Sequence, residues 1–244
     1  MPRLDQREAN ELRPVSFVPH YQRHPLGSVL ACCGNTRVIC AVSLEMAVPR
    51  WMKEQNVAGG WITAEYQMLP SATSQRSERE VMRGKLSGRS AEIQRLIGRS
   101  LRAVVDLAKL PGMTLHVDCD VLDADGGTRC ASITGASVAL ELAAAKLLQD
   151  GLISESPIVA RVAAVSVGMV NGEPLLDLCY QEDSAAEVDM NVVMTDGGRF
   201  VELQGSGEEA SFSEDELAAM LKLAKKGMKD IFALQAGVMQ QAGR

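Results

Sequence analysis

The chain has 244 residues, of which 46% are hydrophobic, and a formal net charge of −6 at pH 7. A chain of this length and composition can bury a substantial core, either as one large domain or as two fused halves. No apolar run approaches the ~20 residues of a membrane span, and the charged N-terminal stretch lacks the apolar segment of a signal peptide. We therefore expect a cytoplasmic protein with no membrane partner.

Charge is divided unevenly along the chain. Residues 1–110 hold 16 Lys and Arg against 10 Asp and Glu, whereas residues 111–244 hold 9 against 21. A basic half can present a positive face to a nucleic acid although the whole chain is acidic. The six cysteines show no C-x-x-C spacing, and several alternate with Val or Ile, so neither a zinc site nor a disulfide framework is indicated.

The first 110 residues are expected to form strands and then a long helix. Two β-rich runs around Gly34-Asn35 predict a hairpin. The stretch 47–67 is typical of a loop that leads into a strand at 61–66. A helix is predicted from about Ser90 to Leu107, because apolar residues recur there at the i, i+3 and i+4 positions.

Basic residues collect before and along this predicted helix. The most basic loop in the chain, within residues 70–90, carries Arg76, Arg79, Arg83, Lys85 and Arg89. A second group forms a stripe on the helix itself and consists of Arg95, Arg99 and Arg102. Such a stripe is either a solvated face or a contact with another subunit or an RNA backbone.

The stretch 114–150 combines a strand, a glycine turn and a helix. Residues 114–121 alternate between apolar and polar side chains, which predicts a half-buried strand. Gly126-Gly127 permits a tight turn, and Thr128-Arg129 opens a helix whose first amides lack intrahelical partners. Those amides, the positive end of the helix dipole and both side chains are suitable donors for a phosphate. The alternative is a corner whose glycines only turn the chain, and the segment matches neither the P-loop nor the dinucleotide fingerprint.

The second half is expected to repeat the order of strands followed by a long helix. Its predicted strands span residues 160–168, 174–180, 187–194 and 199–204. Ser213 and Glu216 form a capping box that predicts the start of a C-terminal helix. We therefore expect an α+β fold, an αβ sandwich built from two similar halves, although no residue-level repeat is evident.

The strand predicted at 187–194 has one acidic face. Glu187, Asp189 and Asn191 share that face, and Glu182 and Asp183 lie in the turn before it. Carboxylate oxygens of this kind suit Mg²⁺, which keeps several waters and bridges phosphate oxygens. The alternative is an acidic strand that faces solvent.

Several long motifs, in the right order and across nearly the whole chain, resemble those of the bacterial ribonuclease PH family. They are Glu11-Leu12-Arg13-Pro14, Gly60-Trp61-Ile62-Thr63-Ala64-Glu65-Tyr66, Gly88-Arg89 with Glu92-Ile93-Gln94-Arg95-Leu96-Ile97-Gly98-Arg99, Asp118-Cys119-Asp120-Val121 with Ala124-Asp125-Gly126-Gly127-Thr128-Arg129, and Glu182-Asp183-Ser184-Ala185-Ala186-Glu187-Val188-Asp189-Met190-Asn191. The resemblance implies one domain over residues 1–244. It also implies a fold akin to the second domain of a small-subunit ribosomal protein, with a rare left-handed βαβ connection that the pattern alone does not predict.

The same resemblance implies an activity and an assembly. Members of this family are phosphate-dependent 3′-to-5′ exoribonucleases that trim transfer-RNA precursors, with a role in ribosomal-RNA processing as well. They use inorganic phosphate as a co-substrate, release nucleoside diphosphates and can run in reverse as nucleotidyltransferases. The resemblance therefore implies RNA 3′ ends as substrates and a homo-hexamer arranged as a trimer of dimers.

Carried over residue by residue, the resemblance also assigns the site. Its phosphate-binding residues fall on Arg89, Gly127, Thr128 and Arg129. Its acidic pair falls on Asp183 and Asp189, which would hold a divalent cation such as Mg²⁺. Asp189 is alternatively a proton donor to the leaving oxygen, and the sequence does not separate these roles. The predicted catalytic residues are therefore Arg89, Arg129, Asp183 and Asp189.

The RNA-binding arginines of the family fall on Arg76 and Arg79. One departure stands nearby: family members commonly carry arginine directly after the Leu-Pro of this loop, whereas here Leu69-Pro70 is followed by Ser71. One RNA backbone contact is then missing or supplied elsewhere. The departure affects the expected affinity for RNA more than the expected chemistry.

Two rival functions share parts of this pattern. A catalytically silent ring subunit of an exosome-like complex would be expected to lack the phosphate arginines or the acidic pair, and both are present here. Polynucleotide phosphorylase shares the chemistry, but it joins two such cores in one chain with added RNA-binding domains. A chain of 244 residues has no room for them.

Overall fold

Two β-sheets and the helices packed along them make up the computed structural model, which describes residues 3, 5–207 and 210–242. The strands of the first half are β1 Val15–Pro19, β2 Gly27–Cys33, β3 Thr36–Glu45, β4 Trp61–Met68 and β5 Thr114–Asp123. Those of the second half are β6 Val162–Val170, β7 Glu173–Leu176, β8 Val188–Thr195 and β9 Phe200–Gly207. The sheets have the orders β1-β2-β3-β5-β4 and β7-β6-β8-β9. The α+β sandwich with two sheets was therefore predicted correctly.

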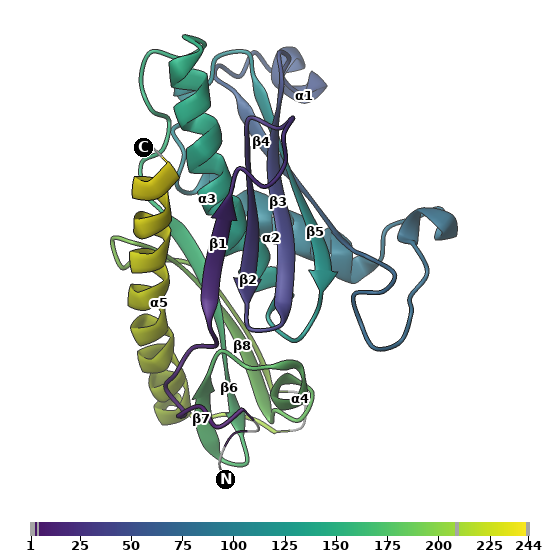
Figure 1. Ribbon diagram of the computed structural model, residues 1–244, viewed down its shortest axis with the longest axis vertical. Helices are drawn as coiled ribbons and strands as arrows, with labels where there is room; N and C mark the ends of the chain where they lie inside the picture. Colours follow the sequence, from purple (N-terminus) through teal and green to yellow (C-terminus); the bar gives the residue numbers. More distant parts are fainter. Residues whose placement is uncertain (1–2, 4, 208–209, 243–244) are drawn as a thin grey trace.

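Helices follow the strands in each half, as Figure 1 shows. They are α1 Arg50–Glu54, α2 Gly88–Arg102, α3 Thr128–Gln149, α4 Tyr180–Asp183 and α5 Glu214–Ala242, with short 3₁₀ turns at Glu80–Arg83 and Leu107–Lys109. The parallel neighbours β4 and β5 are joined through α2, which makes them a βαβ unit. Helix α3 packs on β2 and β3 and also on β6, so it links the two sheets.

Each sheet has its own core. The alternation predicted for residues 114–121 is present in β5, where Leu115, Val117, Cys119 and Val121 are buried in one cluster with residues of α2 and α3. In the second core, Met190 and Val192 of β8 pack with Met220 and other residues of α5. Apolar alternation thus predicted correctly the covered face of β5, whereas β8 is buried on both faces, because Asn191 and Val193 are buried too.

Helix α3 is long and apolar enough, by length and composition alone, to cross a membrane. The sequence-based prediction found no such run. However, 78% of its most apolar window is buried inside the fold, between the sheets. An apolar helix that is mostly covered by its own chain is a core helix.

The first half departs from prediction at two places. The expected hairpin is present, and Gly34 turns it with a φ of +57°. The predicted loop before β4 contains the short helix α1, which starts after Pro49. The predicted helix 90–107 is wrong at its end, because α2 stops at Arg102 and Val105 forms an antiparallel bridge with Ile158.

The second half departs at the end of β7. The predicted strand 174–180 stops at Leu176, because Asp177 has a φ of +54°, in the left-handed region that a strand does not use. The chain then enters α4, so the predicted turn with Glu182 and Asp183 is a short helix. The capping box of α5 is present: Glu216 Oε2 accepts from the Ser213 amide at 2.7 Å, and Ser213 Oγ accepts from the Glu216 amide at 3.3 Å.

Candidate active site

The predicted phosphate turn, residues 125–129, joins β5 to α3. Gly126 and Gly127 have φ values of +74° and +65°. A Cβ on Gly126 would lie 2.7 Å from the backbone of Leu178 and Cys179, so only glycine fits there. Helix α3 begins at Thr128 after Gly127, which has no side chain to cap the first amides. The turn therefore has the backbone geometry expected of an anion site at a helix start.

Thr128 is joined to a buried tyrosine. The hydroxyls of Thr128 and Tyr66 lie 2.8 Å apart, and either can donate. Burial raises the pKa of Tyr66, although its bond to Thr128 and the charges of Arg89 and Arg129 oppose the shift. Tyr66 is therefore a neutral hydroxyl at pH 7. If it donates to Thr128 Oγ1, the Thr128 proton is directed elsewhere, and a bound phosphate is a suitable acceptor.

Arg129 is held between two elements. Its Nη1 donates to Oε1 of Gln204 on β9 and lies 3.6 Å from Oε2 of Glu92 on α2. Gln204 Nε2 also donates to Glu92 Oε1 at 3.1 Å. Both contacts of Arg129 use one nitrogen of a group with five N–H donors, so the same side chain can also bind a phosphate. Glu92 and Gln204 thus orient the guanidinium.

Arg89 lies in the first turn of α2 and is exposed. Helix α2 is capped by Ser87, whose Oγ accepts from the Ser90 amide at 3.0 Å. Ser90 Oγ donates in turn to Glu80 Oε1 at 2.7 Å, which ties the preceding loop to the helix start. The charges of Arg89 and Arg129 both act on the Tyr66 hydroxyl, so both guanidinium groups lie within electrostatic range of it.

Asp189 lies on the polar face of β8 that was predicted from its alternation. In the ladder it is opposite Gly168 of β6 and Ser206 of β9, and it is half-buried. On the same face, buried Asn191 accepts a hydrogen bond from Cys130 Sγ, in the first turn of α3, at 3.2 Å. The interpretation of this face as a solvent-facing acidic strand is therefore wrong, because it points toward the start of α3.

Asp183 ends α4, whose first residue packs against the phosphate turn: a Cβ on Gly126 would lie 2.8 Å from the Tyr180 amide nitrogen. Within the described residues, no group of three or more Asp, Glu, His or Cys is arranged to hold a metal ion. Asp183 and Asp189 offer two carboxylates, a donor set that Mg²⁺ accepts when water and substrate phosphates complete its shell. In the chemistry of their side chains, the two residues therefore offer the ligand type that Mg²⁺ takes.

A buried ion pair supports the phosphate turn from beneath. Arg13 donates from its amide and Nε to Asp177 Oδ2 at 2.8 and 3.0 Å, and from Nη2 to Oδ1 at 2.7 Å. Its Nη1 donates to the carbonyl oxygen of Asp125, and a Cβ on Gly127 would lie 3.0 Å from Nη2. Both side chains of the pair are 4% exposed. Arg13 therefore fastens the turn to the end of β7.

Asp125 fastens the turn to two further elements. Its Oδ2 accepts from Asn35 of the β2–β3 hairpin at 3.1 Å, and its Oδ1 accepts from the Tyr180 amide of α4 at 3.2 Å. Thr36 Oγ1 accepts from the Asp125 amide at 2.9 Å and donates to the Gly126 carbonyl at 2.7 Å. The Asp125 amide and the Gly126 carbonyl of the turn are thus both bonded to the Thr36 side chain.

A second buried ion pair holds α4. Arg3 Nε and Nη2 each donate to Glu182 at 2.7 Å, and the Cys179 amide donates to the same carboxylate at 3.0 Å. Burial alone would raise the pKa of Glu182, but the bonds from Arg3 and Cys179 outweigh it and the pKa is lowered. Sequence reasoning missed these roles of Arg3 and Arg13. The available signal was the Glu11-Leu12-Arg13-Pro14 motif.

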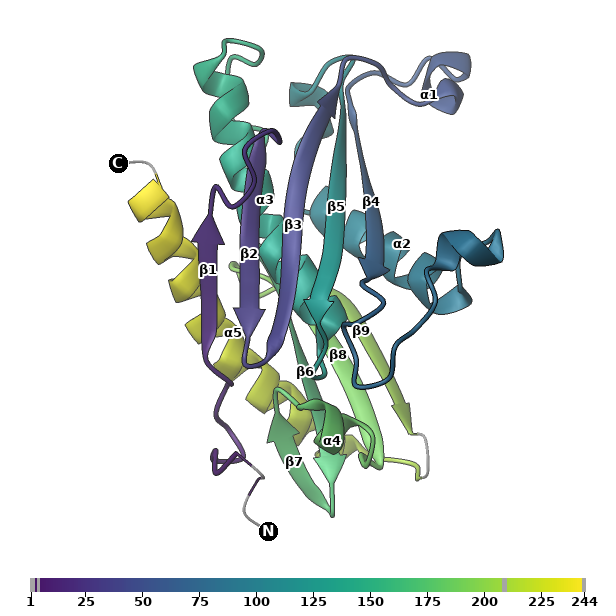
Figure 2. The ribbon, with the colours of Figure 1, turned by 45° about the vertical axis from the view of Figure 1, so that its right-hand side comes forward.

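The basic arm, residues 70–87, stands away from the body between β4 and α2 (Figures 1 and 2). The predicted RNA-binding residues Arg76 and Arg79 are exposed on it, and the side chain of Arg83 lies outside what the structure describes. Arg79 is close enough to Asp120 on β5 to oppose the rise in pKa that burial gives that carboxyl. The predicted RNA residues thus lie on the arm that precedes α2, whereas Thr128 and Arg129 lie at the start of α3.

The arginine stripe of α2 is partly used within the chain. Arg99 donates to Glu202 of β9 at 2.7 and 2.8 Å. Arg102 donates to the Ile62 carbonyl at 2.8 Å and lies 4.6 Å from the centre of the Trp61 ring. A purely solvated stripe is therefore wrong for these two residues.

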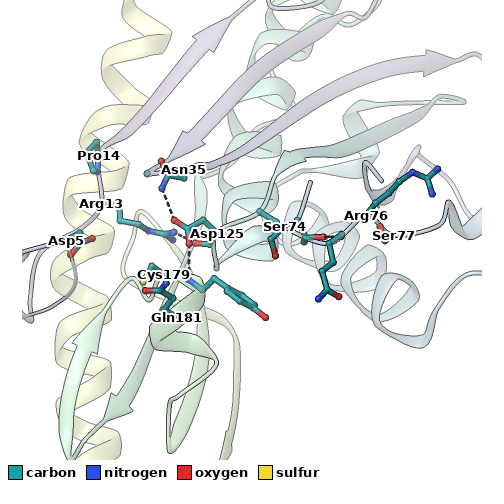
Figure 3. Close-up of a pocket in the computed structure, with 15 residues that line it drawn as sticks. Asp5, Arg13, Pro14, Asn35, Ser74, Arg76, Ser77, Asp125, Cys179 and Gln181 are labelled. Atoms are coloured by element: carbon teal, nitrogen blue, oxygen red, sulfur yellow. Dashed lines mark hydrogen bonds between the residues drawn. The ribbon is translucent and has the colours of Figure 1, made fainter. Parts of the chain in front are cut away.

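A cleft of about 1130 Å³ opens beside the turn. Figure 3 shows Arg76, Ser74 and Ser77 at one side and Asp125, Cys179 and Gln181 at the other. The residues that line it do not include Arg89, Thr128 or Arg129, so the cleft adjoins the predicted phosphate site without containing it.

Solved structures of similar fold include rice (Oryza sativa) Rrp46, with a TM-score of 0.77, 21% identity, and coverage of 96% of this chain and 98% of that chain. An Archaeoglobus fulgidus exosome with RNA bound to the active site gives a TM-score of 0.77 at 21% identity, covering 99% of this chain and 92% of that one. At such identity the likeness shows the fold alone.

Family models identify the class of protein. The model for the 3′ exoribonuclease family, domain 1, matches residues 11–146, and that for domain 2 matches residues 160–227. These matches include the phosphate turn, α2, α4 and β8. The fold and the site thus define a 3′ exoribonuclease.

Full-length relatives narrow the class to one family. Ribonuclease PH of Bacillus velezensis is 56% identical over 238 residues, which cover 97% of this chain and 96% of the relative. Ribonuclease PH of Neisseria meningitidis is 53% identical over 236 residues, 97% of each. The chain belongs to the ribonuclease PH family of phosphate-dependent 3′-to-5′ exoribonucleases, which act in transfer-RNA processing.

Proposed function

We propose that this exoribonuclease trims the 3′ ends of transfer-RNA precursors and other RNAs in the cytoplasm, and that its phosphate turn holds the attacking phosphate. The observation that carries the proposal is the uncapped start of α3, where Thr128 bonds the Tyr66 hydroxyl and Arg129 follows it, with the charges of Arg89 and Arg129 both acting on that hydroxyl. Two guanidinium groups, a hydroxyl and helix amides are the donors that a phosphate dianion accepts.

In the proposed reaction, an oxygen of inorganic phosphate attacks the phosphorus of the last phosphodiester in line with the bond that breaks. The bond from this phosphorus to the 3′ oxygen of the preceding nucleotide breaks, and that oxygen takes a proton. The products are a nucleoside diphosphate and an RNA shorter by one residue. Arg89 and Arg129 offset the repulsion between the two anions, and the same contacts serve the reverse reaction.

Asp183 and Asp189 would hold a divalent cation, Mg²⁺, beside this phosphodiester. When bound, the ion stabilises negative charge on the scissile phosphate and the leaving oxygen. In the alternative role, a protonated Asp189 donates its proton to the leaving oxygen. The half-buried setting of Asp189 near the start of α3 suits either role.

Binding of a transfer RNA is proposed to depend on assembly into a homo-hexamer. A subunit with a net charge of −6 is a poor binder of RNA by itself. A ring gathers the exposed Arg76 and Arg79 of several arms around one nucleic acid and raises its effective concentration at each arm. Sedimentation mass tests the assembly directly.

The test of the function is a single comparison of products. The protein is incubated with 3′-extended RNA and Mg²⁺, with and without phosphate, and the released mononucleotide is identified. We expect nucleoside diphosphates, and only with phosphate present. Nucleoside monophosphates released without phosphate would show hydrolysis and would overturn the proposal. Where Arg89 or Arg129 is replaced by alanine, Arg50→Ala serves as the matched control, because the Arg50 side chain is 91% exposed and bonded only to nearby Glu54 among the described contacts.

A further inference from the structure

The cleft beside the phosphate turn has a lining that differs from the turn itself. Apart from exposed Arg76 on the arm, its charged groups are already engaged: Arg13 with Asp177, Asp125 with Asn35 and the Tyr180 amide, and Asp5 with Arg7 at 2.5 Å. The other lining side chains include amides and hydroxyls, among them Asn35, Ser74, Gln75 and Gln181. A lining of this kind suits a neutral, hydrogen-bonding group better than a phosphate.

Tyr180 adds an aromatic surface to this lining. It is the one aromatic side chain among the described residues of the cleft, and it is 61% exposed. Its backbone amide donates to Asp125 Oδ1, and this hydrogen bond fixes the backbone that carries the ring. Exposed aromatic rings are the usual stacking partners of unpaired bases. The volume of about 1130 Å³ exceeds what one nucleoside needs, since pockets for small organic ligands span about 300–1,000 Å³.

The position of Tyr180 defines which nucleotide would reach it. Tyr180 and Asp183 begin and end α4, three residues apart, and side chains at this spacing share one face of a helix. A base stacked on Tyr180 would therefore lie next to a phosphodiester held at Asp183. The opposite wall of the cleft carries Arg76 of the basic arm, where the body of the RNA is expected. The nucleotide that lies between Asp183 and Arg76 is then the one on the 5′ side of the bond that breaks.

We propose that the cleft binds the nucleoside of the penultimate nucleotide of the RNA, with its base stacked on Tyr180. This subsite rests on the proposed function, because it needs the scissile bond to lie at Asp183 and the phosphate turn. It holds the strand that is retained after cleavage, so it positions the leaving 3′ oxygen. Stacking accepts any base, which suits an enzyme that trims ends of varied sequence.

The test combines a protein change with a substrate change. Short single-stranded RNAs are compared with an intact penultimate nucleotide, with an abasic penultimate nucleotide, and with an abasic site far from the 3′ end. In the unaltered protein, we expect the penultimate lesion to lower kcat/KM roughly 5- to 150-fold, the range that one base–aromatic stack supplies. The distant lesion should have no effect.

Tyr180→Ala should degrade intact RNA with the same lowered kcat/KM that the unaltered protein has on RNA with an abasic penultimate nucleotide. For Tyr180→Ala, the abasic nucleotide should lower kcat/KM no further. Tyr180→Phe keeps the ring and should restore the rate. The KM for phosphate should stay the same in all of them. Tyr21→Ala removes another exposed ring, 47% exposed and outside the cleft lining, and is the matched control. If circular dichroism shows Tyr180→Ala to be unfolded, Tyr180→Leu takes its place in the same comparison.

Two results would overturn the subsite: a wild-type rate for Tyr180→Ala on intact RNA, or a penultimate lesion that still costs Tyr180→Ala as much as it costs the unaltered protein. Either result leaves phosphate-dependent release of diphosphates untouched. Failure of the unaltered protein to release diphosphates would instead refute the proposed function. The two failures are therefore distinguishable in one set of reactions.

Discussion

Arginines serve opposite purposes in two neighbouring regions of this molecule. At the phosphate turn and at α4, Arg13 and Arg3 are buried and each is bonded to one carboxylate. On the basic arm, Arg76 and Arg79 are exposed and form no salt bridge with a carboxylate among the described residues. A buried guanidinium requires a partner because desolvation is costly, whereas an exposed one is free to bind an incoming anion. Charge alone does not indicate function here; burial and partners do.

Arg129 is intermediate between the buried, paired arginines and the exposed arginines of the arm. Its removal should have the largest effect on the rate of phosphorolysis. Its side chain is 14% exposed and oriented by Glu92 and Gln204. Arg129→Ala, and likewise Arg89→Ala, should lower the rate of phosphorolysis by on the order of 10² to 10⁴, because a charge-assisted contact to the nucleophile is lost. Steady-state kinetics at saturating phosphate measure the loss, and filter binding should show RNA affinity largely unchanged. Near-normal turnover in either variant would refute the assignment.

Substitution of Asp177 tests whether the buried Arg13–Asp177 ion pair stabilises the fold. Asp177→Ala leaves Arg13 buried without its carboxylate and also places alanine at a φ of +54°, so we expect a loss of about 3–5 kcal/mol in the free energy of unfolding. Asp177→Asn keeps the shape and tolerates the left-handed backbone, so its loss should be smaller. Urea denaturation of both variants measures the difference. Equal stability of Asp177→Ala and the unaltered protein would contradict the bracing role.

Asp189 separates a chemical role from a structural one. Asp189→Asn should lower the rate by on the order of 10² or more, through loss of the cation site or the proton donor. The fold should persist, because asparagine has nearly the same volume and Met190 and Val192 hold the core side of β8. Circular dichroism that shows an unfolded variant would make Asp189 structural, and our interpretation of this strand would be wrong.

Substitution of the exposed arginines Arg76 and Arg79 tests whether the basic arm binds transfer RNA. Arg76→Ala combined with Arg79→Ala should weaken binding of precursor transfer RNA and flatten its salt dependence, because each lost phosphate contact removes roughly one unit from the log–log slope. Short single-stranded RNA should still be degraded to diphosphates. An equal loss on short and structured RNA would remove the basis for this model. Ser71→Arg should change transfer-RNA affinity in the opposite direction.

Lowering the pH should weaken the Arg3–Glu182 ion pair and so lower the stability of the fold. This is the smallest effect that we expect. The pKa of Glu182 is lower in the folded chain than its ordinary value of 4.5, so the pair stabilises the fold above about pH 4.5 and ceases to do so as the pH falls. Urea midpoints between pH 7 and pH 3 measure the slope. Glu182→Gln should be less stable at pH 7 and should flatten that slope by at most one bound proton. An unchanged slope would contradict the prediction.

Local features could be predicted from the sequence because their causes are local. Alternation placed Val117 of β5 in the core, two glycines and a helix start defined the phosphate turn, and Ser213 with Glu216 marked the start of α5. Each of these depends on residues within a few positions of one another.

The braces of the site could not be predicted, because their partners are far apart in the chain. Arg13 and Asp177 are 164 residues apart, and Arg3 and Glu182 are 179 apart. Before folding, Arg3 resembles any other surface arginine of a polar segment. The left-handed backbone of Asp177, which ends β7 early, is likewise set by tertiary bonds and not by strand propensity.

The Arg13–Asp177 pair also has a consequence for biosynthesis. Arg13 leaves the ribosome long before the residue that neutralises it, since 164 residues separate them. The strands of the first half can pair as they emerge, but the support beneath the Asp125–Gly127 backbone waits for the second half. A nascent chain therefore lacks the Asp177 brace of its phosphate turn until the segment that contains residue 177 has left the ribosome.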